Sequence, residues 1–254
     1  MTYNVGILGK LISILNILFS LPLWSISLLL IVGASLSVWQ KKLTWTAAIT
    51  GALLGFLIFL SAGFFGLAML GTFFLVGSVA TALNFGTKHK LGIAEGDKGQ
   101  RKAGQVWANA GVAGLFSALT LIDPQNTHLF VVAMAGSFSS AIADTLSSEL
   151  GAVYGTKFYN ITTLQKDARG LNGVISIEGC LIGLGGSILI ALIYALGYGF
   201  DEFVVYIIFG GTIGNLSDSL LGATLERKKL MGNNGVNFLS TLIGSLATLS
   251  LCFL

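Results

Sequence analysis

Charge is the scarcest property of this chain. Of its 254 residues only 10% are charged and 54% are hydrophobic, and the mean hydropathy is +0.84. An ordinary soluble domain carries about 25% charged residues, and so few charges cannot cover the surface of a water-soluble particle. The sequence therefore excludes a soluble globule and predicts an integral membrane protein of the all-α class, a polytopic bundle of transmembrane helices.

Cysteine, histidine and proline are also rare, with two of each. Cys180 and Cys252 lie in apolar runs without the spacing of metal ligands, so we expect them to pack in the core rather than form a disulfide or a zinc site. His89 and His128 are isolated, and we expect neither to be a catalytic base. The motifs of phosphate-binding loops, soluble kinases, serine hydrolases and zinc peptidases are absent, which excludes those soluble folds.

Long stretches without charge set the expected number of spans. Thirty residues separate Lys10 from Lys41, and 45 separate Lys42 from Lys88. The later charge-free windows are 103–122, 124–143, 179–200, 203–217 and 230–254. Because about 20 apolar residues cross a bilayer, we predict seven to nine spans. Pro22 interrupts the first window, where one kinked helix and two half-spans both fit; a cleaved signal peptide at residues 1–20 is the less favoured alternative.

Basic residues predict how the chain is oriented. They form four loops, each separated from the next by room for two spans: Lys41–Lys42, Lys88–Lys102, Lys157–Arg169 and Arg227–Lys229. The turns between them, at Asp123 and at Asp201–Glu202, carry acids only. We therefore expect all four basic loops to face the cytoplasm, in a bacterial inner membrane or a thylakoid-type membrane. The net charge of +3 is then a topology signal, and we expect no nucleic-acid partner.

The chain is predicted to be one integral membrane domain, residues 1–254, with two compositions. Residues 1–86 contain no acid and suit scaffold spans, whereas all 11 acids lie in 87–235, so the catalytic spans and basic loops are expected in 87–254. The 34 glycines indicate closely packed helices. The glycines at 51, 55 and 71 permit a homodimer without requiring one.

Four acids lie within or at the ends of apolar helices: Asp144, Glu149, Glu178 and Asp218. An ionised carboxylate in a membrane helix costs a few kcal/mol, so such residues indicate function. The alternative is that each acid reaches the headgroups or pairs with a loop lysine. Four such acids that all face basic loops favour a functional site over this alternative.

The first polar stretch, residues 97–109, leads into an apolar span. Arg101, Gln105 and Asn109 are spaced i, i+4 and i+8, so a helix would align one cation and two amides in a stripe that suits phosphate oxygens. An ordinary positive-inside anchor would explain the arginine but not the amides.

Two further polar stretches, residues 143–155 and 214–227, contain the central acids. Asp144 and Ser148 share a helix face, while Glu149 is turned by about 140° from Asp144, so one carboxylate could bind a metal and the other orient a partner. Asn215 and Asp218 fall on one face of a later helix. Mg²⁺ takes one or two carboxylates plus substrate phosphates, which this sparse set of acids can offer.

Three segments of these stretches, R-K-A-G-Q-V-W-A-N, D-T-L-S-S-E-L-G and G-N-L-S-D-S-L-L-G-A-T-L-E, resemble signatures of the phytyl-phosphate kinase family. These are membrane proteins of tocopherol and phylloquinone synthesis, with many bacterial and archaeal relatives known only as an integral membrane domain. The resemblance runs from about residue 45 to the end. More distantly, the last two segments are similar to CTP-dependent phytol and dolichol kinases and to CDP-lipid synthases.

The resemblance implies transfer of the γ-phosphate of a nucleoside triphosphate, CTP being favoured, to an isoprenyl or phytyl monophosphate, with Mg²⁺. It implies catalytic roles for Asp144, Asp218, Arg101 and Lys102, and metal ligation by Asp144, Asp218 and Glu149. The residues that it implies for substrate or nucleotide binding are Gln105, Asn109, Ser148, Lys157, Arg169, Asn172 and Asn215. Relatives often carry glycine where this chain has Ala110, which we expect only to loosen helix packing.

Two other functions fit the same residues. A CDP-lipid synthase would use the same metal but attack the α-phosphate and release pyrophosphate. A transporter of an anionic small molecule would use glycine-broken helices and polar groups near the midplane. A transporter also predicts a repeat between the two halves, and the sequence shows no convincing one.

Overall fold

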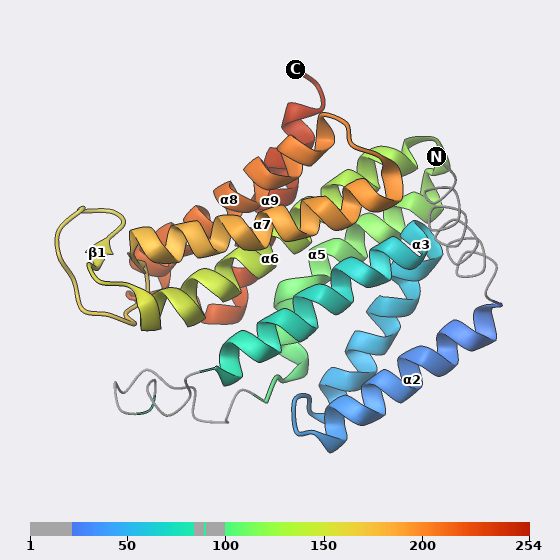
Figure 1. Ribbon diagram of the computed structural model, residues 1–254, viewed down its shortest axis with the longest axis horizontal. Coiled ribbons are helices and arrows are strands. Elements are labelled where there is room, and N and C mark those ends of the chain that lie inside the picture. Colours follow the sequence, from blue (N-terminus) through green and yellow to red (C-terminus); the bar gives the residue numbers. More distant parts are fainter. Residues whose placement is uncertain (1–21, 84–88, 90–99) are drawn as a thin grey trace, which may run out of the picture.

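The computed structural model describes residues 22–83, 89 and 100–254, and it is a bundle of helices (Figure 1). The helices are α2 (Leu23–Trp39), α3 (Trp45–Ala82), α5 (Ala103–Ile122), α6 (Thr127–Tyr154), α7 (Ile177–Tyr198), α8 (Phe203–Leu221) and α9 (Asn233–Leu251). A 3-10 turn at Pro124–Asn126 precedes α6, and a π-helical turn at Gly222–Glu226 extends α8. Two short strands, β1 (Tyr159–Asn160) and β2 (Val174–Ile175), pair antiparallel in the α6–α7 loop. The predicted all-α membrane class is confirmed.

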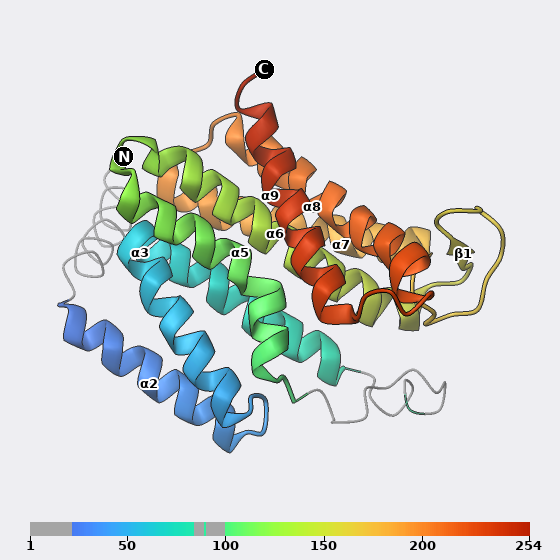
Figure 2. The ribbon, with the colours of Figure 1, turned by 180° about the vertical axis from the view of Figure 1, so that it is seen from behind.

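Helix α3 is a hairpin of two arms. It bends at Gly63, where φ is +58° and ψ is −148°, a backbone conformation that favours glycine. Residues 45–62 pack against α2, and residues 64–82 turn back at an angle to them (Figures 1 and 2). The turn is tight, because a Cβ on Gly66 would lie only 2.9 Å from Cγ2 of Ile58.

Five stretches are long and apolar enough to cross a membrane: Trp45–Ala82, Ala103–Ile122, Pro124–Tyr154, Ile177–Tyr198 and Phe203–Glu226. With α3 counted as two arms, and with the shorter helices α2 and α9, the described residues form eight helical segments. Eight segments lie within the predicted range of seven to nine, but only five helices of the described residues meet the length and hydropathy of a span, so the span count stays a prediction. Residues 1–21, including the predicted signal-peptide alternative, lie outside the described residues.

Helix α6 is the centre of the bundle and packs against α3, α5, α7, α8 and α9 (Figure 2). Its buried face is rich in small residues, which let neighbouring backbones approach closely. At Gly151, for example, a Cβ would lie 2.6 Å from Cα of Gly179 on α7. Ser140 Oγ donates a hydrogen bond to Ser240 O of α9 (3.1 Å), which ties a second neighbour to α6.

The loops that carry the basic residues lie at one end of the bundle. The α2–α3 turn, the approach to α5, the α6–α7 loop and the α8–α9 turn share this end, and the turns at Asp123 and Asp201 lie at the other (Figure 1). We call it the basic end. The predicted alternation is therefore present, although most of the loop 88–102, with Asp97 and Lys98, lies outside the described residues. Which compartment the basic end faces stays a prediction.

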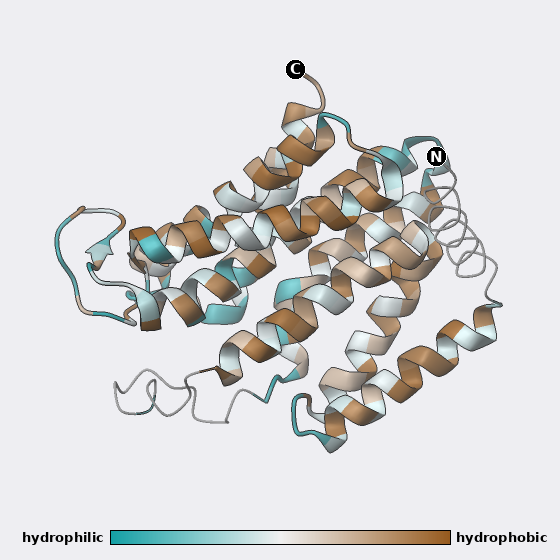
Figure 3. Cartoon of the chain, in the orientation of Figure 1, coloured by the Kyte–Doolittle hydropathy of each residue, from teal (hydrophilic) through white to brown (hydrophobic). Residues whose placement is uncertain are grey.

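Hydrophobic residues make up most of each helix, and the hydrophilic segments of the central helices lie toward the basic end (Figure 3). Among the glycines predicted to permit a dimer, Gly55 already packs against another helix of the same chain, since a Cβ there would lie 2.9 Å from Cδ2 of Leu30 on α2. A Cβ built on Gly51 or Gly71 would meet no atom of the described residues within 4 Å. The homodimer stays a prediction.

Candidate active site

A polar pocket of about 310 Å³ lies at the basic end, beside the C-terminal half of α6. Its walls come from the end of α3, the start of α5, α6, the α6–α7 loop, the end of α8 and the start of α9. Nine predicted site residues line it: Arg101, Gln105, Asn109, Asp144, Ser148, Glu149, Asn172, Asn215 and Asp218. Helices far apart in the sequence therefore bring one set of polar side chains together.

Asp144 of α6 and Asp218 of α8 form a carboxyl pair in this pocket, close enough for the two side chains to interact. Within the described part of the chain, Oδ2 of Asp218 is buried and has no hydrogen-bond partner. The carboxylates of Glu226 and Glu149 add negative charge around Asp144. Since neighbouring desolvated carboxylates repel each other, this arrangement calls for a shared proton or a cation.

Two carboxylates can supply only part of the ligands of a metal ion, and magnesium as that ion stays a prediction. In residues 22–83, 89 and 100–254, no group of three His, Cys, Asp or Glu side chains is placed to hold a metal ion. Mg²⁺ commonly binds through one or two carboxylates and takes its other ligands from water and substrate phosphates. Asp144 and Asp218 can supply that share. Glu149 lines the pocket, but it is not placed with Asp144 and Asp218 as such a group of three, so the predicted three-acid ligand set is not found among the described residues.

Arg101 reaches the pocket from outside a helix, because α5 begins only at Ala103. Its backbone pairs with the α2–α3 turn, where its N–H donates to Lys42 O (2.9 Å) and its carbonyl accepts from Thr44 N (3.0 Å). Its guanidinium carbon lies 5.0 Å from the centre of the Phe73 ring of α3. The second arm of α3 therefore helps to build a site that the sequence placed only in residues 87–254.

Amide side chains form a layer beside the carboxyl pair. Asn109 and Asn215 are only 8% and 5% exposed. Asn109 Nδ2 donates to Gln105 O (2.9 Å), and Asn215 Oδ1 accepts from Ser147 Oγ (2.8 Å). Asn237 Nδ2 approaches Asn109 Oδ1 at 3.5 Å, while Asn237 Oδ1 is buried without a partner among the described residues. Such groups suit hydrogen bonds to phosphate or sugar oxygens.

Some lining residues escaped the sequence analysis. Asn237 lies near the start of the last helix and Glu226 at the end of the polar stretch 214–227, and the sequence analysis gives neither residue a role in the site. Thr81 belongs to the acid-free region that was assigned to scaffold. All three line the pocket. The available signal was the group of three amides, Asn233, Asn234 and Asn237, at the start of α9.

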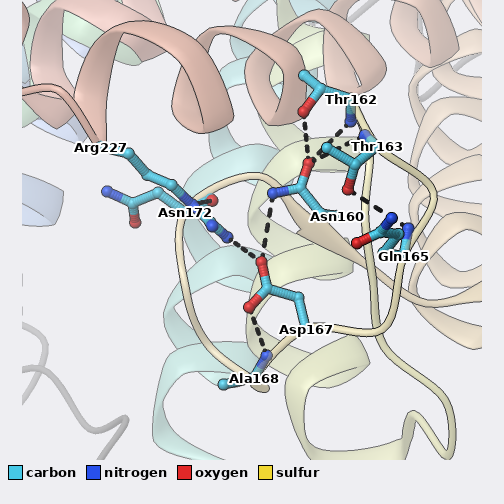
Figure 4. Close-up of polar contacts among 8 residues, drawn as sticks. All are labelled: Asn160, Thr162, Thr163, Gln165, Asp167, Ala168, Asn172 and Arg227. Carbon is cyan, nitrogen blue, oxygen red and sulfur yellow. Dashed lines mark hydrogen bonds and ion pairs between the residues drawn. The ribbon is translucent and has the colours of Figure 1, made fainter.

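The α6–α7 loop is fastened to the end of α8 by a polar network (Figure 4). Asp167 Oδ2 lies 2.8 Å from Nη2 of Arg227, and Arg227 Nε donates to Asn172 O (2.5 Å). Asp167 also accepts from the backbone N–H of Ala168 (2.7 Å) and from Asn160 Nδ2 (3.2 Å). These hydrogen bonds lower the pKa of Asp167. The backbone N–H of Ala168 contributes most, followed by the side chains of Arg227 and Asn160. The network holds Asn172 against the pocket.

Three predicted cations lie outside the pocket lining. Lys102 is exposed at the N-cap of α5, and Lys157 is exposed in the α6–α7 loop. Arg169 donates from Nη2 to Gly155 O (3.1 Å) and stacks 4.7 Å over the Phe158 ring. Glu178, one of the four membrane acids, accepts hydrogen bonds from the backbone N–H and Oγ1 of Thr156. The structure thus gives Arg169 and Glu178 contacts in the loop, and the substrate-binding roles of the three cations stay predictions.

The chain resembles several membrane proteins along most of its length. It is 36% identical over 203 residues to an uncharacterised membrane protein of Synechocystis sp., covering 76% of each chain. It is 31% identical over 222 residues to an uncharacterised membrane protein of Methanocaldococcus jannaschii, covering 87% of this chain and 91% of that one. It is 29% identical over 229 residues to the chloroplastic protein VTE6 of Arabidopsis thaliana, covering 87% of this chain and 68% of that one.

No solved structure matches the chain. The family description "Integral membrane protein DUF92" matches residues 28–245, a range that contains every residue of the pocket lining. The match extends over the helical bundle and the basic end, and it confirms the family that the three signature segments indicate. The chain belongs to the DUF92 family of integral membrane proteins.

Proposed function

We propose that this protein is a membrane-embedded isoprenyl phosphate kinase. It transfers the γ-phosphate of a nucleoside triphosphate, with CTP favoured, to an isoprenyl monophosphate, with phytyl monophosphate favoured. The observation that carries the proposal is the carboxyl pair Asp144–Asp218 beside Arg101 in a polar pocket at the end of a membrane bundle. The signature segments and the match to a chloroplastic relative support it.

The reaction needs no strong general base. An oxygen of the acceptor monophosphate attacks the γ-phosphorus and forms a new P–O bond, while the bond from that phosphorus to the β,γ-bridging oxygen breaks. A nucleoside diphosphate leaves, and the acceptor becomes an isoprenyl diphosphate. Because the acceptor phosphate is already an anion at neutral pH, catalysis consists of positioning and charge neutralisation. The lack of a histidine in the pocket lining agrees with this chemistry.

The residues of the pocket can divide these tasks. Asp144 and Asp218 would hold Mg²⁺, which when bound neutralises phosphate charge. Arg101 would neutralise a phosphate from the other side, and Gln105 and Asn109 would hold the phosphate oxygens by hydrogen bonds. A pocket at the end of the bundle lets a lipid phosphate and a nucleotide from water meet in one plane. By the positive-inside rule we place that plane at the cytoplasmic face.

The test is an assay of detergent-purified protein with Mg²⁺, γ-labelled CTP or ATP, and phytyl or geranylgeranyl monophosphate, with products separated by thin-layer chromatography. We expect label in the isoprenyl diphosphate, lost in Asp144→Asn and kept in Asp123→Asn, which makes the same change at the opposite end. A CDP-lipid formed from α-labelled CTP would instead identify a CDP-lipid synthase. No product in either assay would overturn the kinase and favour the transporter.

A further inference from the structure

Two groups of residues within the pocket lining come from different elements. One group, which we call the α3–α5 subsite, consists of Thr81, Arg101, Gln105 and Asn109. The other, the loop subsite, consists of Phe158, Asn172, Gly173 and Glu226. Asp144 is close to both groups, since its neighbour Thr145 lies beside Gly77 together with Arg101, and the Glu226 carboxylate acts on its carboxyl group. Two substrates could therefore approach the carboxyl pair from different elements.

The α3–α5 subsite suits a phosphate attached to an apolar chain. Arg101, the one cation of the pocket lining among the described residues, belongs to it and is held over the ring of Phe73. The arm of α3 that forms its wall exposes Leu75, Val79 and Leu83, with 63%, 57% and 46% of each residue accessible. These positions are spaced i, i+4 and i+8 on one face of the arm, which the bilayer would cover. Gly77 and Thr81 lie on the opposite face of the same arm, and Gly77 faces Arg101. The arm therefore has one face for lipid and one for the pocket, so an apolar chain and its phosphate could meet at the end of this arm.

The loop subsite suits a nucleobase. It combines a carboxylate, Glu226, with the amide of Asn172 and the ring of Phe158. The nearby cations have other contacts, because Arg227 binds Asp167 and Asn172 O, and Arg169 stacks on Phe158. A carboxylate accepts hydrogen bonds from an exocyclic amino group, as in cytosine or adenine, and an aromatic ring can stack on the base. The subsite is formed by the α6–α7 loop and the end of α8, which lie at the basic end, where water would reach them.

We propose that the α3–α5 subsite binds the phosphate of an apolar alcohol monophosphate, that the loop subsite binds the amino-bearing base of the nucleotide, and that their phosphates meet at Asp144 and Asp218. This assignment rests on the proposed kinase function and deepens it. It also gives Gly77 a role as a positioning residue, because a Cβ there would lie 2.7 Å from Nη2 of Arg101. The missing side chain leaves the space that the guanidinium occupies.

Gly77→Ala tests the α3–α5 subsite without removing any polar group. The atom that the new methyl group meets is the far end of a flexible side chain, so the protein can fold while the guanidinium moves. We expect the KM for isoprenyl monophosphate to rise about three- to tenfold, and in Arg101→Ala about tenfold or more, as for loss of a charge-assisted hydrogen bond. The KM for the nucleotide should stay within about twofold. Gly71→Ala is the matched control on the same helix, because a Cβ at position 71 would meet no atom within 4 Å.

Glu226→Gln and Asn172→Ala test the loop subsite. We expect each to raise the KM for CTP about five- to tenfold and to leave the KM for the isoprenyl monophosphate unchanged. Glu226→Gln should also reduce the preference for CTP over UTP, because an amide can donate to the uracil carbonyl. A variant that merely unfolds would lower kcat with every substrate and elute abnormally on size exclusion, so the KM pattern separates binding from folding.

The assignment would be overturned if Gly77→Ala raised the KM for the nucleotide, if Glu226→Gln raised the KM for the lipid phosphate, or if both constants rose together in every variant. Failure of the proposed function looks different, because the wild-type protein would then form no isoprenyl diphosphate. In that case equilibrium binding of isoprenyl monophosphate to wild type and Gly77→Ala still decides the lipid-phosphate subsite. Equal affinities would refute it.

Discussion

Gly173 is the residue through which the α6–α7 loop rests on the end of α8. Its φ is +73°, and a Cβ built there would lie 2.5 Å from the backbone nitrogen of Ala223 and 2.6 Å from its Cα. Alanine at 173 would adopt a left-handed conformation, which costs about 1–2 kcal/mol. It would also force two backbones apart, and overpacking of this kind costs about 1–3 kcal/mol. Gly173→Ala should therefore weaken docking of the loop by about 2–5 kcal/mol.

Limited trypsin digestion reports this docking, because Lys166 lies in the same loop. When opening and closing of a segment are fast, the cleavage rate follows the population of the open form. A cost of about 2 kcal/mol raises that population about 30-fold, so cleavage after Lys166, identified by fragment mass, should accelerate at least about tenfold. The KM for the nucleotide should rise with it, since the loop forms one wall of the pocket.

Gly199→Ala is the matched control for backbone strain. Gly199 also has a positive φ, +109°, but a Cβ there meets nothing within 4 Å, and the residue follows α7 at the opposite end of the bundle. Trypsin should cleave the α6–α7 loop of the Gly199→Ala variant as it cleaves that of the wild type. If Gly173→Ala also cleaves like the wild type and keeps its nucleotide KM, the loop does not rest on α8 as described.

Three other outcomes are expected. Asp144→Asn and Asp218→Asn should each reduce kcat at least about 100-fold, because the amide keeps the shape but removes the charge that would hold Mg²⁺; turnover retained in both would refute the metal assignment, with size exclusion as the check on folding. Because the pKa of Asp167 is lowered in the folded protein, its carboxylate stabilises the loop at any pH above the unfolded pKa of about 3.9. This stabilisation is lost as the pH falls through the folded pKa. Relative to the intrinsic rate at each pH, hydrogen exchange of the loop should thus be constant from pH 7 to 5 and become faster below about pH 4. Asp167→Asn should abolish this pH dependence. Tyr194→Phe removes the 3.0 Å hydrogen bond to His128 at the opposite end; it should cost about 0.5–1.5 kcal/mol in thermal unfolding and leave kcat unchanged, and a lower kcat in the folded variant would argue against a site confined to the basic end.

The sequence predicts the fold well because hydropathy and charge act along the chain. Apolar windows of about one bilayer thickness must become helices, since lipid offers the backbone no hydrogen-bond partners. The spacing of the four basic loops then requires them to share one end, and the described residues show this arrangement. The hairpin in α3 is less visible from sequence, because its bend depends on a single backbone conformation at Gly63 within an uninterrupted apolar run.

The acids and amides were found for the same reason. A carboxylate or an amide in an apolar helix is costly, so Asp144, Asp218, Asn109 and Asn215 stand out in the sequence, and all four line one pocket. The loop cations do not stand out in this way, since lysine and arginine mark the basic end whether or not they bind substrate. Arg101 lines the pocket while Lys102 does not, and no local pattern separates two adjacent cations.

By itself, then, the sequence determined the membrane class, the alternation of the loops and the identity of the central acids, because each follows from the cost of placing a group in lipid. Only the tertiary structure decided that Asp144 and Asp218 lie close together in one pocket, that Gly77 makes room for Arg101, and that Glu226 and Thr81 join the pocket. Those features depend on how closely α3, α6 and α8 approach one another and where the α6–α7 loop docks. Helix packing through small residues sets these distances between segments far apart in the chain, where no pattern along one segment specifies them.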